Sequence, residues 1–113
     1  MTSRRQRRVT ELLLEEISLI AQDLNDPRLA FVSVTDVEVS PDLRHAHVFI
    51  SHMGETEEKP LVLKALEHAT SYLRRELALR GILRYVPELS FHWDTSLEQG
   101  ERIDQLLQEI GLG

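Results

Sequence analysis

Four closely spaced arginines are the residues whose type and spacing best suit a chemical task. Between Ser71 and Val86 the sequence holds one acidic residue, Glu76, together with Arg74, Arg75, Arg80 and Arg84. A guanidinium group donates paired hydrogen bonds to phosphate oxygens, so such a cluster suits a nucleic-acid backbone. A run of charge along a helix is, however, more often a solvated surface. The residues alone leave both interpretations open.

A second group of arginines lies at the start of the chain. The first eight residues contain no acid and four arginines, namely Arg4, Arg5, Arg7 and Arg8. Cations at the N-terminus of a helix oppose the helix dipole, at a cost of up to about 1 kcal/mol each. Either this helix end frays in solution or its cations serve a binding partner.

Histidines and a serine could form a metal site or a catalytic group. His45 and His47 share the outward face of one predicted strand, but no third metal ligand is identifiable. Ser90, His92 and Asp94 share a face of another strand, where alternate side chains stand about 6–7 Å apart. That separation is too large for direct hydrogen bonds. We therefore expect exposed histidines, no metal and no catalysis.

Aromatic residues near the arginines offer little further support for a base-stacking site. Tyr72 and Tyr85 flank the cluster and could stack on bases, although packing within the protein is the favoured interpretation. Phe91 and Trp93 alternate with polar residues along a predicted strand, which indicates a buried position.

Composition excludes several classes of protein. The chain has 113 residues, 42% of them hydrophobic, which predicts a single domain over residues 1–113. A net charge of −6 argues against general coating of nucleic acid, and the absence of cysteine fits a cytoplasmic protein. No apolar run could span a membrane. The sequence contains no phosphate-binding loop and no dinucleotide-binding motif, so we expect neither a cofactor nor a small-molecule substrate.

Periodic patterns predict a helix followed by two strands. The spacing of apolar residues predicts a helix over residues 3–24, with Ser3 and Gln6 as a capping box. Residues 31–39 read as a strand whose apolar parity slips, which indicates a bulge near Thr35 and Asp36. After the turn at residues 40–42, alternating residues predict a second strand over residues 45–51.

The next region has two readings. Helix propensity predicts one continuous helix from Pro60 to Arg80, ended by Gly81. A break between Ala69 and Ser71 is equally open, with Ser71 capping a second helix. The amides of such a helix start, beside two arginines, would form a phosphate site.

Strand alternation resumes after Pro87, and a short amphipathic segment completes the chain over residues 95–113. A hairpin, a helical crossover and a third strand together predict an α+β fold. Its helices are expected on one face of a three-stranded mixed sheet. The strand order stays open.

Three stretches carry a resemblance to a known family. They are the DPRL turn at residues 26–29, VSVTDVEVSPDLRHAHVFIS at residues 32–51, and PELSFHWDTSLEQGERIDQLL at residues 87–107. In order and spacing they resemble ribosome-binding factor A of bacteria, over nearly the whole chain. The resemblance implies a type II KH-like fold, α-β-β-α-α-β, here with the short C-terminal helical segment.

The same resemblance implies a function. Members of this family bind the free small (30S) ribosomal subunit and assist late maturation of 16S rRNA, including processing of its 5′ end, and they are linked to growth in the cold. The implied protein is a monomeric, non-catalytic RNA-binding factor whose partners are the small subunit and its 16S rRNA.

Site residues follow from matching positions. An Ala-x-Gly kink in the family corresponds here to Ala69, Thr70 and Ser71, so serine replaces the family glycine. The family's basic positions fall on Arg74, Arg80 and Arg84, while Arg75 is added because of its proximity. The longer C-terminal tails of the family are largely absent, so contacts made by such tails are not assumed.

Two other functions provide contrasts. A protein–protein adaptor would use the acidic segment over residues 95–113 and leave the arginines solvated. A metal-dependent hydrolase would use His45, His47 and His92 and would contain stoichiometric metal, which we do not expect.

Overall fold

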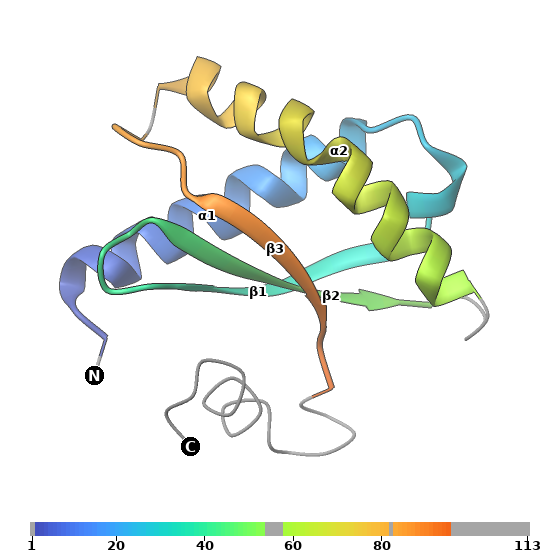
Figure 1. Ribbon diagram of the computed structural model, residues 1–113, viewed down its shortest axis with the longest axis horizontal. Coiled ribbons are helices and arrows are strands. Elements are labelled where there is room, and N and C mark those ends of the chain that lie inside the picture. The colour runs from blue at the N-terminus through green and yellow to red at the C-terminus, as the bar shows by residue number, and fades with distance from the viewer. Residues whose placement is uncertain (1, 54–57, 82, 96–113) are drawn as a thin grey trace.

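The protein folds into two long helices and a small sheet. The structure, a computed structural model, describes residues 2–53, 58–81 and 83–95. Figure 1 shows the described elements in chain order, which are α1 (Arg4–Asp23), the 3-10 helix η1 (Pro27–Leu29), β1 (Val32–Val39), β2 (His45–His52), α2 (Lys59–Arg80) and β3 (Glu88–Trp93). The predicted C-terminal segment lies almost wholly outside the described residues, and η1 was not predicted.

A capping box starts α1 and attaches it to the sheet. The Ser3 hydroxyl accepts the Gln6 amide at 3.1 Å, and the Gln6 side-chain oxygen accepts the Ser3 amide at 3.0 Å. The Gln6 side-chain nitrogen then donates to the Val39 carbonyl at 3.0 Å, and Gln6 is buried. The predicted capping box is confirmed, and it places the first turn of α1 beside the end of β1.

The sheet is mixed, with strand order β1-β2-β3. β1 pairs with β2 in antiparallel fashion, and β2 pairs with β3 in parallel fashion. The parallel pair follows from α2, which carries the chain across the sheet between these two strands. The register of the first pair shifts between Val34 and Asp36, so the predicted bulge is confirmed.

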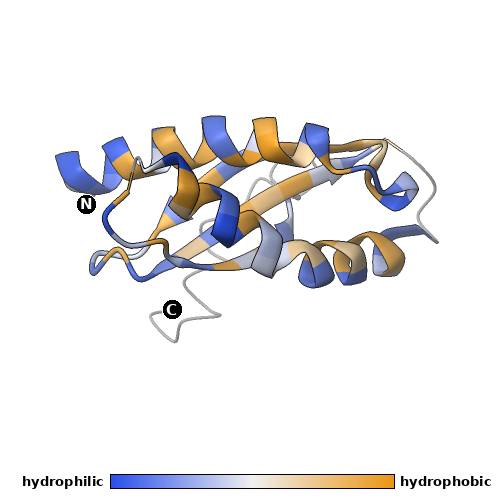
Figure 2. Ribbon diagram, turned by 90° about the horizontal axis from the view of Figure 1, so that it is seen from above, coloured by the Kyte–Doolittle hydropathy of each residue, from blue (hydrophilic) through white to orange (hydrophobic). Residues whose placement is uncertain are grey.

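One face of the sheet carries the core. Ala46, Val48 and Ile50 of β2 are each at most 1% exposed, and they meet apolar residues of both helices. Figure 2 shows hydrophobic and hydrophilic turns alternating along α1, as expected for a helix with one buried stripe. Both helices therefore lie on the same face, and the predicted α+β fold is confirmed.

α2 is a single helix rather than two. Its helical assignment runs from Lys59 to Arg80 without a break, so Ser71 caps nothing. The continuous helix that propensity predicts is correct, and the second helix implied by the resemblance is not formed. Thr70 donates from its hydroxyl to the Leu66 carbonyl at 3.0 Å, a bond that tends to bend helices. The ribbon of α2 bends near its middle (Figure 1).

Gly81 ends α2 as predicted. Its φ of +67° is the left-handed conformation that glycine adopts without strain, and its amide donates to the Ala78 carbonyl at 3.1 Å. Among the described helices, none is long and apolar enough to cross a membrane.

Candidate nucleic-acid interface

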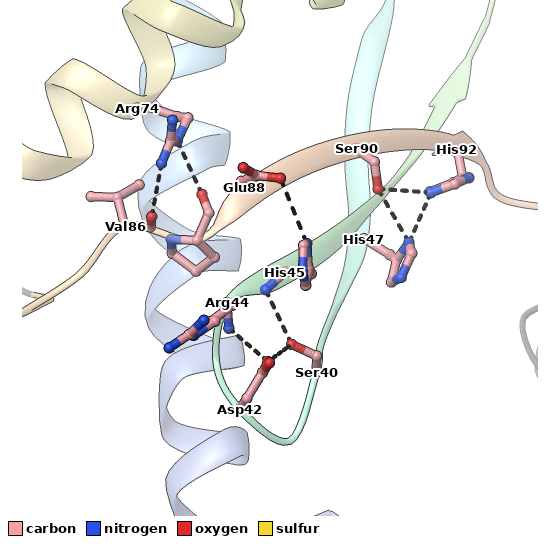
Figure 3. A network of polar contacts seen from close by, with 11 residues as sticks. Ser40, Asp42, Arg44, His45, His47, Arg74, Val86, Glu88, Ser90 and His92 are labelled. Atoms are coloured by element: carbon pink, nitrogen blue, oxygen red, sulfur yellow. Dashed lines mark hydrogen bonds and ion pairs between the residues drawn. The ribbon is translucent and has the colours of Figure 1, made fainter. Parts of the chain in front are cut away.

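Arg74 is anchored by the segment that leads into β3. Its Nε donates to the Pro87 carbonyl at 3.2 Å, and its Nη2 donates to the Val86 carbonyl at 3.1 Å (Figure 3). A guanidinium carries five N–H donors, so others remain for a ligand. Arg74 is exposed. The side chain therefore holds the chain before β3 in place and still presents a positive charge.

Arg80 connects the two helices. Its Nη1 lies 2.8 Å from Oε2 of Glu16, which belongs to α1. The two side chains are 36% and 18% exposed, so this ion pair lies at the surface. Sequence spacing did not reveal it, because 64 residues separate the partners.

The other two arginines of the predicted cluster make fewer contacts. The Arg75 guanidinium lies 5.9 Å from the centre of the Tyr72 ring, a cation–π arrangement. Arg84 is exposed and its neighbour Tyr85 is 78% exposed. The packing interpretation of Tyr85 was wrong: the loop after Gly81 directs this ring to solvent, where a base could stack on it.

The kink positions are partly accessible. Ala69 and Thr70 are half-buried and Ser71 is exposed, all three inside α2. Because the helix continues through them, their amides belong to the helical ladder and do not form the anion site that a helix start would offer. Any RNA contact here would come from side chains.

The N-terminal arginines lie on the first turns of α1. Arg4, Arg5, Arg7 and Arg8 all belong to this helix and are exposed. The capping box stabilises this end of α1, where the cations oppose the helix dipole. Figure 1 shows the start of α1, the β1–β2 turn and the C-terminal half of α2 at the same end of the molecule. We call this region the basic end; its arginines include the eight predicted ones.

Sequence reasoning missed one arginine of the basic end. Arg44 follows the β1–β2 turn, and its side chain is exposed. Its amide donates to Oδ1 of Asp42 at 3.0 Å, and that carboxylate also accepts the Ser40 hydroxyl at 2.6 Å. These bonds, first the one from Ser40, hold the pKa of Asp42 below its usual range. Turn signals around Pro41 could have drawn attention to Arg44.

The histidines form a contact that was not expected. Nδ1 of His47 lies 2.9 Å from Nε2 of His92, and the Ser90 hydroxyl lies 3.2 and 3.0 Å from these two nitrogens (Figure 3). The prediction that Ser90 and His92 are too far apart for a direct hydrogen bond was wrong, because the imidazole ring extends along the strand toward the hydroxyl. Asp94 instead accepts the Thr35 hydroxyl at 2.5 Å.

This histidine group is not joined by the third predicted histidine. His45 lies apart from it, with Nδ1 3.8 Å from Oε2 of Glu88. Within the described part of the chain, no group of three or more His, Cys, Asp or Glu side chains is arranged to hold a metal ion. The group is therefore a cross-strand polar contact on the face of the sheet opposite the helices.

Comparisons with known proteins agree on one family. The family model of ribosome-binding factor A matches residues 5–107. Ribosome-binding factor A of Halothermothrix orenii is 48% identical over 111 residues, which are 97% of this chain and 91% of the relative. The protein of the same name from Thermomicrobium roseum is 50% identical over 111 residues, 97% and 86% of the two chains.

Solved structures give the same result. The crystal structure of ribosome-binding factor A from Thermus thermophilus is similar with a TM-score of 0.70 and 30% identity, covering 78% of this chain and 93% of that one. A homology model of the Thermus thermophilus factor, fitted into the cryo-EM map of a 30S complex, is similar with a TM-score of 0.64 and 30% identity. It covers 76% of this chain and 91% of that one.

The matching motifs, the KH-like α+β fold and the family model lead to one assignment. This chain belongs to the ribosome-binding factor A family.

Proposed function

We propose that this chain binds the free small (30S) ribosomal subunit and assists late maturation of 16S rRNA, including processing of its 5′ end, without catalysis. The observation that carries the proposal is the basic end. A protein with a net charge of −6 gathers most of its arginines there, from three separate parts of the chain. Such segregation gives an acidic protein one surface that attracts a polyanion.

The arrangement suits backbone contacts rather than base reading. Arginine side chains at ordered positions neutralise phosphates and thereby fix orientation, while shape supplies selectivity for folded RNA. Exposed Tyr72 and Tyr85 add stacking surfaces next to these cations. A small rigid body attached in this way would hold immature rRNA in one conformation until other steps are complete.

A relative supports the choice of particle. The structure-based neighbour described in a 30S complex shares 30% identity with this chain over 76% of its length. The further expectations, a monomer in the cytoplasm with a role during growth in the cold, belong to the same proposal and rest on the family resemblance.

Co-sedimentation tests the proposal directly. The full chain would be incubated with purified small subunits, large subunits and intact ribosomes at low and moderate salt, then pelleted. We expect salt-sensitive pelleting with small subunits alone, because released counterions drive phosphate contacts. Equal pelleting with all particles would indicate unselective attraction and would contradict the choice of small subunits.

A maturation assay tests the second half of the proposal. Cells lacking the factor are expected to accumulate 16S rRNA with an unprocessed 5′ end, most strongly in the cold. Normal 5′ ends in those cells would limit the function to binding. No pelleting of the folded chain with any particle would leave the protein–protein adaptor as the leading alternative.

A further inference from the structure

The β1–β2 turn holds Arg44 in a fixed position. The Leu43 amide donates to the Ser40 carbonyl at 2.9 Å, and the His45 carbonyl accepts the Ser40 amide at the same distance. The Asp42 carboxylate binds the Arg44 amide at 3.0 Å. Leu43 has a φ of +62°, a conformation that costs a residue with a side chain about 1 kcal/mol or more. A surface turn that carries this cost is well defined.

The turn is also connected to the anchor of Arg74. The Arg44 carbonyl accepts the Glu88 amide at 2.8 Å, which is the first bond of the β2–β3 pair. Arg74 binds the carbonyls of Pro87 and Val86, which are one and two residues before Glu88. Figure 3 shows Arg44 and Arg74 on two sides of this segment. Two arginines 30 positions apart in sequence are thus held by three consecutive residues.

The charge of Arg44 is available for a ligand. In the part of the chain that the structure describes, its side chain makes no hydrogen bond or ion pair, and the same is true of Arg84. Of the acids near the turn, Asp42 accepts the Ser40 hydroxyl and the Arg44 amide and also attracts the Arg44 charge, whereas Glu88 faces His45 at 3.8 Å. An exposed guanidinium group on a backbone fixed by hydrogen bonds is a preorganised phosphate contact.

We propose that Arg44 and Arg74 form one cationic edge that binds phosphates of an RNA backbone, with Arg44 as a contact that the sequence did not reveal. The inference rests on the proposed function and adds a residue to it. A guanidinium group donates paired hydrogen bonds to phosphate oxygens, which a lysine ammonium group cannot do. The β1–β2 turn therefore belongs to the binding surface.

The test is the salt dependence of binding to purified small subunits, measured for three variants of the full chain. Arg44→Gln removes the charge, Arg44→Lys keeps it, and Arg28→Gln removes an equal charge at the opposite end of the molecule. We expect Arg44→Gln to reduce the slope of log affinity against log salt concentration by about 0.7–0.9. When the salt concentration is quadrupled, the affinity of this variant for small subunits should therefore fall about threefold less than that of the unaltered chain. Arg44→Lys and Arg28→Gln are expected to keep the original slope.

The outcomes separate the inference from the function on which it rests. Salt-sensitive binding by the unaltered chain with an unchanged slope for Arg44→Gln would overturn the role of Arg44 alone. No binding by the unaltered chain would overturn both. Circular dichroism and the urea unfolding midpoint of Arg44→Gln are expected to match those of the unaltered chain, because the side chain makes no hydrogen bond or ion pair within the described residues.

Discussion

The two ends of this molecule differ in the contacts that their cationic side chains make within the protein. At the end opposite the basic end, Arg28 binds Asp26 through two side-chain hydrogen bonds of 3.1 and 2.8 Å. Lys59 lies 5.2 Å from the centre of the Trp93 ring. Arg28 and Lys59 therefore have partners within the protein, whereas Lys64 of α2 is exposed and makes no hydrogen bond or ion pair within the described residues.

At the basic end, most cations are left to solvent. Within the described residues, seven arginines make no side-chain hydrogen bond or ion pair, namely Arg4, Arg5, Arg7, Arg8, Arg44, Arg75 and Arg84. A positive charge without a partner costs little at a surface, but several such charges together repel one another. The two ends therefore differ both in the number of their cations and in how many of these cations have partners within the protein.

The largest effect is expected from the N-terminal arginines. Replacing Arg4, Arg5, Arg7 and Arg8 together by Gln should reduce the salt slope of small-subunit binding by up to about 3–4. When the salt concentration is raised fourfold, the affinity of the variant should therefore fall up to about 100-fold less than that of the unaltered chain. Stability should rise at the same time, because each cation opposes the α1 dipole. Binding titrations and urea unfolding measure the two quantities. Weaker binding together with lower stability would show that the substitutions damaged the helix.

Next in size is the effect of Arg74 on stability. Arg74→Ala removes the donors to the Val86 and Pro87 carbonyls, and we expect it to lower the free energy of unfolding by about 1–2 kcal/mol. Arg75→Ala is the matched control one residue away; it loses only the cation–π contact with Tyr72 and should stay within about 0.5 kcal/mol. Urea denaturation compares them. Equal effects would mean that Arg74 does not hold the entry to β3.

A smaller effect on stability distinguishes the ion pair of Arg80 with Glu16 from its proposed contact with RNA. Arg80→Ala and Glu16→Ala both break the interhelical ion pair, and each should cost about 0.2–1 kcal/mol of stability. Only Arg80→Ala should weaken small-subunit binding, because Glu16→Ala releases the guanidinium for a phosphate. If both variants lose affinity equally, Arg80 acts through helix packing rather than through RNA contact.

The smallest effect concerns pH at the opposite end. The hydrogen bonds from Arg28 hold the pKa of Asp26 below its usual value of 3.8. A lowered pKa stabilises the folded state at pH values above 3.8, and this stabilisation disappears as the pH falls through the lowered pKa. Asp26→Asn should therefore lower the unfolding midpoint slightly at pH 7, and this difference should disappear as the pH falls below the lowered pKa of Asp26. A difference that persists in acid would assign the effect to the turn rather than to the charge.

Much of the fold followed from local patterns. The capping box at Ser3, the bulge near Thr35 and the stop at Gly81 each depend on residues within a few positions of one another. Backbone geometry fixes the periods of helix and strand, so such signals are readable along the chain. The three stretches that resemble the family could also be recognised in the sequence, and the comparisons confirm that resemblance.

The resemblance was less reliable in detail. It implied two helices where α2 is one, because Ser71 replaces the glycine that would break the helix and serine continues a helix without strain. Here the propensity of this chain's own residues predicted the outcome better than the pattern of its relatives.

The sequence by itself determined the first helix, the three strands, the end of α2 at Gly81 and the number of arginines. The tertiary structure decided which arginines have partners within the protein. Arg74 meets Val86 and Pro87, Arg80 meets Glu16, and Arg44 joins the same edge through Glu88. Each of these contacts depends on strand order and helix placement. Those are set by packing of the whole core, and no short spacing along the chain records them.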